Sequence, residues 1–307
     1  MRSAIVTGGR GFIGRCLVKA LRGRGVDVRT IGRSPSADTT HIVLEEGSWD
    51  SPALDRVLEE AAPDCIFHLA GRARGTPAEL SQANLGLMQC LLRALRRTNL
   101  QPQLVVAGSA AEYGAAIRDG VPIRETAICA PLSAYGVSKQ AQTRAALAYA
   151  DATGTSVLVA RIFNPLGPNM PTHLAIGDFA NQIASMRRDY GVLQVGNIDV
   201  RRDMIDIEHI ATLLCQLAAN PDAQGVVNLC SGQAPVLREL VEMLIYGSGR
   251  KVEIEIDWSR VRGNEPRTII GSTDLLAKLG CPPPPTDFPA LITRVCRSMK
   301  ESATSAP

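Results

Sequence analysis

The chain has 307 residues, which is enough for about two domains of roughly 150 residues each. Hydrophobic residues make up 45% and charged residues 21%, so we expect folded domains with sizeable cores and exclude a wholly disordered chain. The net charge of +3 comes from 33 basic and 30 acidic residues, and aromatic residues are only 4%. Since nucleic-acid grooves combine dense basic charge with stacking aromatics, no nucleic-acid partner is expected.

The sequence also bears on membranes and redox chemistry. No run approaches the roughly 18 consecutive apolar residues of a membrane-spanning helix, so no membrane association is expected. Residues 1–3 lead directly into a short strand-like run and a glycine cluster, without the apolar stretch of a signal peptide. Eight cysteines are scattered along the chain without a C-x-x-C pair. Free buried thiols in a reducing cytoplasm fit this pattern better than disulfides or a metal site.

Residues 1–163 alternate short β-branched runs with longer helical patterns, which is typical of βαβ units around a parallel sheet. The strands expected here are, in chain order, 4–7, 26–31, 65–69, 104–107 and 157–160. The helices expected between them are 12–24, 52–62, a long helix that includes Leu85, Met88, Leu92 and Leu95, and 135–153. The predicted fold class is therefore α/β, with a doubly wound parallel sheet.

The pattern changes after residue 163. Residues 164–195 hold a loop, a helix from about 177 to 188 and a short strand, while 233–300 add a helix, a strand, a Pro-rich stretch and a final helix. We interpret these two segments as a smaller C-terminal α/β domain that binds the substrate, and about 196–232 as a return to the sheet domain. Residues 301–307 are expected to form an irregular tail.

A glycine-rich motif joins the first strand to the first helix. It reads Thr7-Gly8-Gly9-Arg10-Gly11-Phe12-Ile13-Gly14, with glycines at 8, 11 and 14. A glycine loop between a strand and a helix lets the backbone approach a pyrophosphate, and the helix N-terminus offers free N–H groups to it. We therefore expect Gly8, Arg10, Gly11, Phe12 and Ile13 to bind a dinucleotide on a Rossmann-like sheet.

The end of the second strand indicates which dinucleotide binds. An NAD site favours an acidic residue there for the ribose 2′-hydroxyl, whereas an NADP site favours a cation. Here the segment is Ile31-Gly32-Arg33-Ser34, without an acid. We predict NADP as the cofactor, with Arg33 and then Arg10 as the residues that read its 2′-phosphate; NAD remains the alternative.

A second motif carries the acid–base chemistry. Tyr135 and Lys139 lie four residues apart in a predicted helix and so share one face, and Ser109 ends an earlier strand. A neighbouring ammonium favours the phenolate, so we expect Lys139 to lower the pKa of Tyr135 from its usual value near ~10. Tyr135 would then serve as an acid or base near neutral pH.

With these motifs, the chain resembles an extended short-chain dehydrogenase/reductase of the branch that modifies nucleotide sugars. The resemblance covers nearly the whole chain and includes His68-Leu69-Ala70-Gly71, Asn84, Tyr113-Gly114 and Arg161-Ile162-Phe163-Asn164-Pro165. It implies that Leu69, Ala70, Gly71, Tyr135 and Lys139 contact the cofactor, and that Ser109, Tyr135 and Lys139 form the catalytic triad. It also implies a homodimer.

Within that branch, the C-terminal half is similar to reductases of GDP-4-keto-6-deoxymannose. The similarity is carried by residues 195–203 and 227–232. It implies a nucleotide-diphosphate sugar held by Ser109, Glu112, Asn164, Arg202 and Arg262, with the two arginines on the diphosphate. For Arg202, a structural pair with Asp203 or Asp206 is the alternative.

Departures from the family pattern reduce the number of activities to consider. Ala110 and Ala111 stand where the 4,6-dehydratases carry an acid, so dehydration is not expected. The main hypothesis is NAD(P)H-dependent reduction of a nucleotide-linked 4-keto-6-deoxy sugar, with Tyr135 as proton donor. The alternative is a nucleotide-sugar 4-epimerase that retains NAD, followed by a non-catalytic dinucleotide-binding protein.

Overall fold

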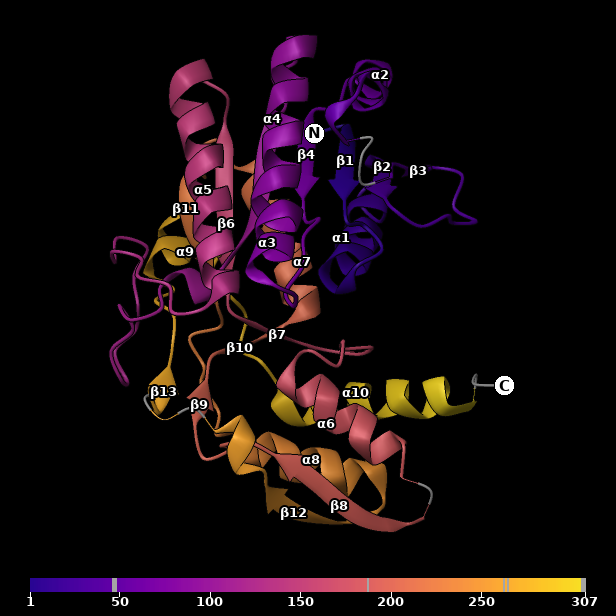
Figure 1. The fold of residues 1–307 in the computed structure, drawn as a ribbon, viewed down its shortest axis with the longest axis vertical. Helices are drawn as coiled ribbons and strands as arrows, with labels where there is room; N and C mark the ends of the chain where they lie inside the picture. Colours follow the sequence, from indigo (N-terminus) through magenta and orange to yellow (C-terminus); the bar gives the residue numbers. More distant parts are fainter. Residues whose placement is uncertain (46–48, 187, 262, 264, 305–307) are drawn as a thin grey trace.

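Seven parallel strands form the central sheet of the computed structural model, which describes residues 1–45, 49–186, 188–261, 263 and 265–304 (Figure 1). Their spatial order is β11-β6-β5-β4-β1-β2-β3. The strands are β1 (Ser3–Thr7), β2 (Asp27–Gly32), β3 (His41–Val43), β4 (Cys65–His68), β5 (Gln103–Ser109), β6 (Val157–Ile162) and β11 (Gly225–Leu229). The chain order reverses between β1 and β4, which is the doubly wound arrangement. The predicted fold class is confirmed.

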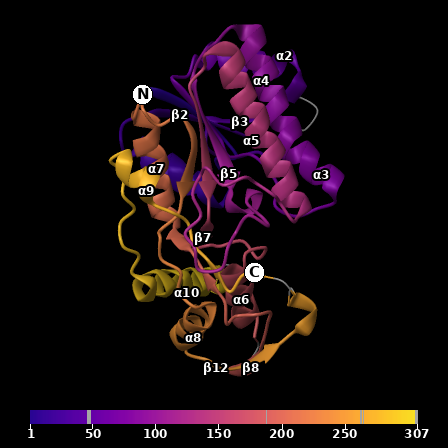
Figure 2. The ribbon, with the colours of Figure 1, turned by 90° about the vertical axis from the view of Figure 1, so that its left-hand side faces the viewer.

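Helices cover both faces of this sheet, as Figure 2 shows. One face packs against α1 (Phe12–Arg22), α7 (Ile207–Ala219) and α9 (Asp274–Lys278). The other packs against α2 (Pro52–Ala61), α4 (Leu87–Thr98) and α5 (Ala134–Thr153). Because both faces are covered, β4 and β6 are buried along their whole length and read as continuous apolar runs rather than alternating ones. No helix in the described ranges is long and apolar enough to cross a bilayer.

A second apolar cluster lies beyond the carboxyl ends of the strands, in the lower part of Figure 1. Its elements are α6 (Ala175–Ala184), β8 (Tyr190–Val195), α8 (Leu237–Ser248), β12 (Lys251–Ile256) and α10 (Phe288–Thr304). The chain enters this region twice, once after β6 and once after β11. Two short parallel pairs connect it to the sheet: β7 (Asn164–Leu166) with β10 (Met204–Asp206), and β9 (Arg201–Arg202) with β13 (Thr268–Ile269).

Three predicted helices have different bounds in the structure. The helix expected from about 177 to 188 is α6, which ends at Ala184. The long helix that includes Leu85 begins earlier, as α3 (Pro77–Ser81), and a π-helical turn (Gln82–Gly86) separates it from α4. Residues 301–304, predicted to belong to the tail, are the end of α10, and 305–307 lie outside the described residues.

Asp203, between β9 and β10, ties three separate segments together. Its buried carboxylate accepts the backbone N–H of Ser231 (2.8 Å), Gly232 (3.1 Å) and Gly271 (3.0 Å), and also the Ser231 hydroxyl (2.9 Å). Burial raises the pKa of this carboxyl, and the hydrogen bonds oppose that rise. Asp203 therefore fixes the chain that follows β9 against the chain that follows β11 and β13.

Asp203→Ala should lower the free energy of unfolding by at least about 3 kcal/mol, because each buried N–H left without an acceptor costs ~1–3 kcal/mol. Chemical denaturation measures the change. The control is Asp199→Ala, which removes only an exposed pair with Arg238 (2.6 Å) and should cost at most about 1 kcal/mol. Equal losses in the two variants would contradict the role given to Asp203.

Candidate active site

The glycine loop between β1 and α1 is built for close backbone contacts. Gly8 has φ +69°, and a Cβ there would lie 2.8 Å from the backbone nitrogen of Ala70. A Cβ on Gly14 would lie 2.2 Å from the carbonyl oxygen of Gly8. The first turn of α1 can therefore pack against the loop only because residue 14 has no side chain. Gly11 caps α1 and has no side chain to occupy the first-turn N–H groups. The loop is therefore a backbone cradle suited to a pyrophosphate.

A cleft of about 560 Å³ opens at this cradle, at the carboxyl ends of β1, β2 and β4. Seven of the predicted cofactor residues line it, namely Gly8, Arg10, Gly11, Arg33, Leu69, Ala70 and Gly71. Phe12, Ile13, Tyr135 and Lys139 are not among its lining residues. Phe12 and Ile13 are the first residues of α1, so a pyrophosphate in the cradle would meet their backbone N–H groups rather than their side chains.

Arginines line the cleft near the end of β2. Arg10 reaches across from the glycine loop, and its Nη1 donates to the carbonyl oxygens of Ser34 (2.9 Å) and Pro35 (2.5 Å). Arg33 follows β2 directly and lines the same cleft. The two guanidinium groups predicted to read a 2′-phosphate therefore belong to one wall, in the position where an NAD site has an acid.

The sequence interpretation missed Arg15 and Arg72 as lining residues of this cleft, and it assigned no contact to Trp49, which also lines it. Arg15 lies in the first turn of α1, and Arg72 directly follows the predicted Gly71. Their positions beside recognised motifs are a signal that could have identified both. Trp49, which is 2% exposed, lies beyond the second strand and carries no motif of its own.

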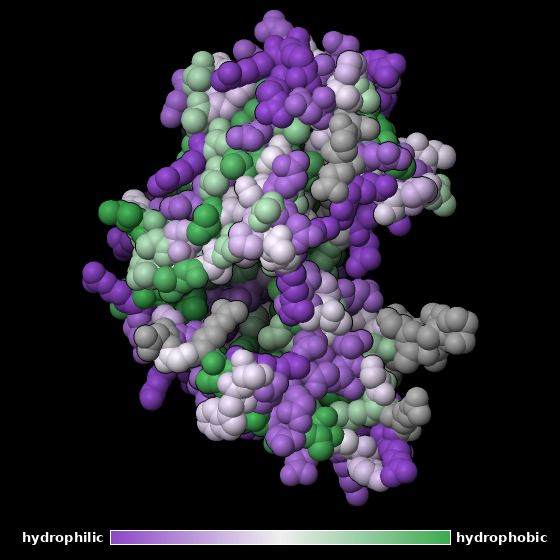
Figure 3. Space-filling model, in the orientation of Figure 1, coloured by the Kyte–Doolittle hydropathy of each residue, from purple (hydrophilic) through white to green (hydrophobic). Residues whose placement is uncertain are grey.

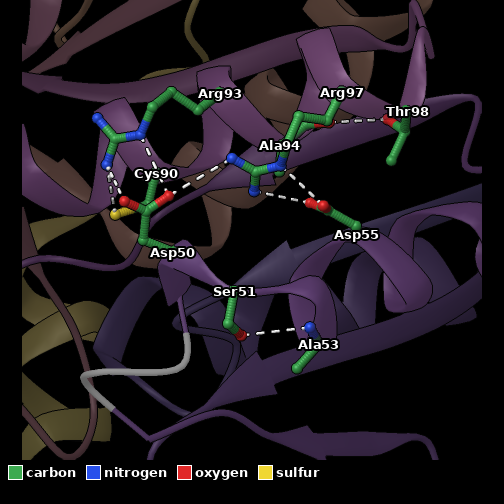
Figure 4. Close-up of polar contacts among 9 residues, drawn as sticks. All are labelled: Asp50, Ser51, Ala53, Asp55, Cys90, Arg93, Ala94, Arg97 and Thr98. Carbon is green, nitrogen blue, oxygen red and sulfur yellow. Dashed lines mark hydrogen bonds and ion pairs between the residues drawn. The ribbon is translucent and has the colours of Figure 1, made fainter.

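The segment after Trp49 is anchored to α4 by ion pairs (Figure 4). Asp50 pairs with Arg93 (2.9 Å) and Arg97 (3.5 Å), and Arg97 also pairs with Asp55 of α2 (2.7 Å). Arg93 and Arg97 are nearly half exposed, and their ion pairs hold the segment that follows Trp49 against α4.

Ser109 and Tyr135 meet at the carboxyl end of β5. Ser109 is the last residue of β5, and Tyr135 lies in the first turn of α5, near enough for the Ser109 hydroxyl to influence the pKa of Tyr135. Burial raises the pKa of Tyr135, and the Ser109 hydrogen bond opposes this rise while Glu112 adds to it. The expected lowering of the Tyr135 pKa is therefore wrong, because burial is the largest influence on this phenol and raises its pKa. The phenol keeps its proton at neutral pH.

Lys139 is 5% exposed and points into the sheet edge. Its Nζ donates to the carbonyl oxygen of Ala107 and to Oε1 of Gln142 (2.6 Å). Burial lowers the pKa of Lys139 to about 8, and the charge of Glu112 opposes this shift. Lys139 is thus cationic at neutral pH but closer to losing its proton than an exposed lysine.

Glu112 does not face a substrate. Its side chain is 0% exposed, and its two oxygens accept the backbone N–H of Ser109 (2.8 Å) and Nε–H of Arg161 (3.1 Å). The prediction that Glu112 contacts the substrate is wrong, because the carboxylate turns inward to the buried arginine.

Of the two arginines predicted to bind the diphosphate, the structure describes only Arg202. Arg202 is 7% exposed and pairs with Glu265 (2.7 Å), rather than with Asp203 or Asp206. Its Nη1 also donates to the carbonyl oxygens of residues 201, 266 and 267. A diphosphate would reach Arg202 only by taking the place of Glu265. Arg262 lies outside the described residues.

Asn164 lies at the start of β7, and its side-chain nitrogen donates to the carbonyl oxygen of Asp203 (2.7 Å). Figure 3 shows the surface hollowed between the sheet and the region of α6, α8 and α10. Ser109 at the end of β5 and Asn164 after β6 both belong to the sheet edge that borders this region.

A doubly wound sheet with a glycine cradle at its switch point and an adjacent Ser–Tyr pair defines a Rossmann-type dinucleotide-dependent enzyme. Residues 4–230 match the NAD dependent epimerase/dehydratase family, and the chain belongs to that family. It is an NAD(P)-dependent oxidoreductase of the extended short-chain dehydrogenase/reductase type. The predicted family, enzyme class and dinucleotide cofactor are confirmed.

Two curated relatives and one solved structure illustrate the similarity. GDP-6-deoxy-D-mannose reductase of Pseudomonas aeruginosa is 36% identical over 217 residues, which cover 68% of this chain and 71% of the relative. dTDP-6-deoxy-L-talose 4-dehydrogenase (NAD(P)(+)) of Kitasatospora kifunensis is 30% identical over 285 residues, covering 87% and 89%. The structure of RMD from Pseudomonas aeruginosa complexed with NADPH is 29% identical, with a TM-score of 0.83, and the match covers 98% of this chain and 100% of that chain.

Binding of NADPH should quench the fluorescence of Trp49, because this residue lines the cleft. The chain has two tryptophans, and Trp258 is 76% exposed. In a fluorescence titration, Trp49→Phe should lose most of the quenching, whereas Trp258→Phe should retain it. Quenching that survives in Trp49→Phe and disappears in Trp258→Phe would place the cofactor elsewhere.

Proposed function

We propose that the protein reduces a nucleotide-linked 4-keto-6-deoxy sugar of the GDP-4-keto-6-deoxymannose type with NADPH. The observation that carries this proposal is the placement of Ser109, at the end of β5, and Tyr135, in the first turn of α5, at the same edge of the sheet, where burial keeps the proton on the phenol. Reduction of a ketone needs a proton donor at the forming alkoxide, and a phenol of raised pKa is in the donor form at neutral pH. The similarity to a GDP-6-deoxy-D-mannose reductase supports the choice of substrate.

In the proposed reaction, the cofactor supplies the hydride and side chains of the protein supply the proton and the hydrogen bonds. Bound NADPH would supply the hydride for the carbonyl carbon. Tyr135 would deliver its proton to the carbonyl oxygen, and Ser109 would donate a hydrogen bond to the same oxygen as charge develops on it. Lys139 would hold the cofactor ribose and the tyrosine in position. Ala110 and Ala111 give the site no carboxylate for elimination of water, so the reaction ends at the alcohol.

The remaining parts of the chain would hold the two ligands. In this proposal, residues 1–163 with about 196–232 bind the cofactor, and 164–195 with 233–300 bind the nucleotide sugar. The diphosphate would replace the Glu265 carboxylate at Arg202, since it carries more negative charge and forms bidentate bonds with a guanidinium. Arg262 and Asn164 would complete this end of the site.

The proposal is tested by mixing purified protein with NADPH and a small panel of nucleotide-linked 4-keto-6-deoxy sugars. Consumption of NADPH in equal amount to the sugar reduced is expected. A 4-epimerase would instead contain retained NAD, visible in the absorbance of the purified protein, and would consume no NADPH. That outcome would overturn the proposal.

Tyr135→Phe should lower kcat by about 10²–10⁴-fold, because the variant lacks the hydroxyl group that carries the transferred proton. The dissociation constant for NADPH should remain nearly unchanged, since Tyr135 does not line the cofactor cleft. Steady-state kinetics and a fluorescence titration measure the two effects. A variant that retains more than about a tenth of the wild-type rate would show that another group donates the proton.

Arg33→Ala should weaken NADPH binding by roughly 10–100-fold and leave NADH binding almost unchanged, because one charge-assisted hydrogen bond contributes ~1.5–3 kcal/mol. Arg24→Ala is the matched control: its guanidinium bonds to Ala20 at the exposed end of α1, away from the cleft. Equal losses for both cofactors in Arg33→Ala would show that Arg33 does not read the 2′-phosphate.

A further inference from the structure

A buried ion pair lies directly behind the Ser–Tyr pair. Glu112 ends the short 3-10 turn (Ala110–Glu112) that follows β5, and Arg161 comes from the neighbouring strand β6. Their side chains are 0% and 7% exposed, and the Nε–Oε2 distance is 3.1 Å. Two buried charges are costly to desolvate, and replacement of such a pair by apolar residues is often neutral for stability. Stability alone therefore does not explain why this pair is present, and a role in the adjacent site is the alternative.

Arg161 is itself fixed from two sides. Its guanidinium carbon lies 4.7 Å from the centre of the Tyr113 ring, a cation–π contact. The Tyr113 hydroxyl in turn donates to Oδ1 of Asn228 on β11 (2.6 Å). Three adjacent strands, β11, β6 and β5, thus hold the Glu112 carboxylate in one place.

The carboxylate acts on Ser109 through a capping box. Glu112 Oε1 accepts the backbone N–H of Ser109 (2.8 Å), while the Ser109 Oγ accepts the backbone N–H of Ala111 (3.2 Å). Because one lone pair of Oγ accepts the N–H of Ala111, the hydroxyl hydrogen can point in fewer directions. The orientation of Oγ, which influences the pKa of Tyr135, is thereby restricted.

We propose that Glu112, held by Arg161, is a positioning residue that orients the Ser109 hydroxyl for the reaction at Tyr135. This inference rests on the proposed reductase function. Glu112 touches neither reacting atoms nor cofactor in this arrangement; it acts through Ser109 and through its charge.

The charge contribution follows from the groups around the two titrating residues. Ser109 and Glu112 face Tyr135, and Glu112 and His68 on β4 face Lys139. His68 is neutral because burial and Lys139 lower its pKa to about 3. The Glu112 carboxylate raises the pKa of both Tyr135 and Lys139, so it favours the protonated form of each.

The test variant is Glu112→Gln, which retains an oxygen for the Ser109 N–H but removes the charge. We expect kcat to fall about 10–100-fold with little change in NADPH affinity, as for a misplaced catalytic group. The basic limb of the kcat–pH profile should move to lower pH, because Tyr135 and Lys139 both lose the carboxylate that favours their protonated forms. The matched control is Glu125→Gln, another carboxylate that accepts a backbone N–H (Asn228, 3.0 Å); it should leave both measurements unchanged.

A double-variant comparison separates positioning from general structure. In a Ser109→Ala background, Glu112→Gln should reduce kcat by less than about threefold, because the hydroxyl that it orients is already gone. Equal reductions in both backgrounds would overturn the proposal. If Glu112→Gln alone fails to fold, the double variant Glu112→Gln/Arg161→Gln removes both buried charges. A folded double variant with wild-type kcat and pH profile would also overturn it.

One readout is independent of the substrate. The ionisation of Tyr135 is measured by ultraviolet phenolate absorbance, with the Tyr135→Phe titration subtracted. Its midpoint should lie at lower pH in Glu112→Gln than in the wild-type protein, and an unchanged midpoint contradicts the charge effect. If no keto sugar is reduced by wild-type protein, the proposed function fails, while this titration still decides the role of Glu112.

Discussion

The site depends on one constraint, the parallel direction of the seven strands. The register aligns Thr7 of β1 with His68 of β4, and His68 with Val106 of β5. The carboxyl ends of these strands consequently share one edge of the sheet. The glycine cradle, the cleft wall and Ser109 each begin where a strand ends, so residues that lie far apart in the sequence meet at this edge. Helices pack on both faces of the sheet behind that edge.

Charge inside this edge is balanced rather than absent. Lys139 loses much of its hydration, and burial alone would move its pKa further from that of a free lysine. The Glu112 carboxylate opposes that shift, and Arg161 compensates the carboxylate in turn. Glu112 and Arg161 form a buried ion pair, and the Glu112 carboxylate still favours the protonated forms of Tyr135 and Lys139. Interactions of this kind are stronger here than at the surface, because little water is present to screen them.

Sequence patterns predicted the fold and the cofactor cleft well, because both follow from local rules. Two local patterns can be read from neighbouring residues alone: the continuous apolar runs of β4 and β6, and the spacing of Gly8, Gly11 and Gly14. Other features depend on partners distant in the sequence. Glu112 turns inward because of Arg161, 49 residues away, and Tyr135 keeps its proton because of burial that its own helix does not reveal. A motif thus identifies which groups meet, whereas their ionisation and orientation are set by the packing around them.

The two arginine–carboxylate pairs near the site show how burial decides function. Glu112 is fully enclosed by β5, β6 and α5, so no ligand can take its place at Arg161 without opening the core. The Glu265 side chain is 27% exposed, whereas the side chain of its partner Arg202 is only 8% exposed. An anion that approaches from solvent therefore meets Glu265 at a rim and Arg202 behind it. Under the proposed function, this difference makes Arg202 the arginine that exchanges partners with a diphosphate, and Arg161 the one that keeps its carboxylate throughout the reaction.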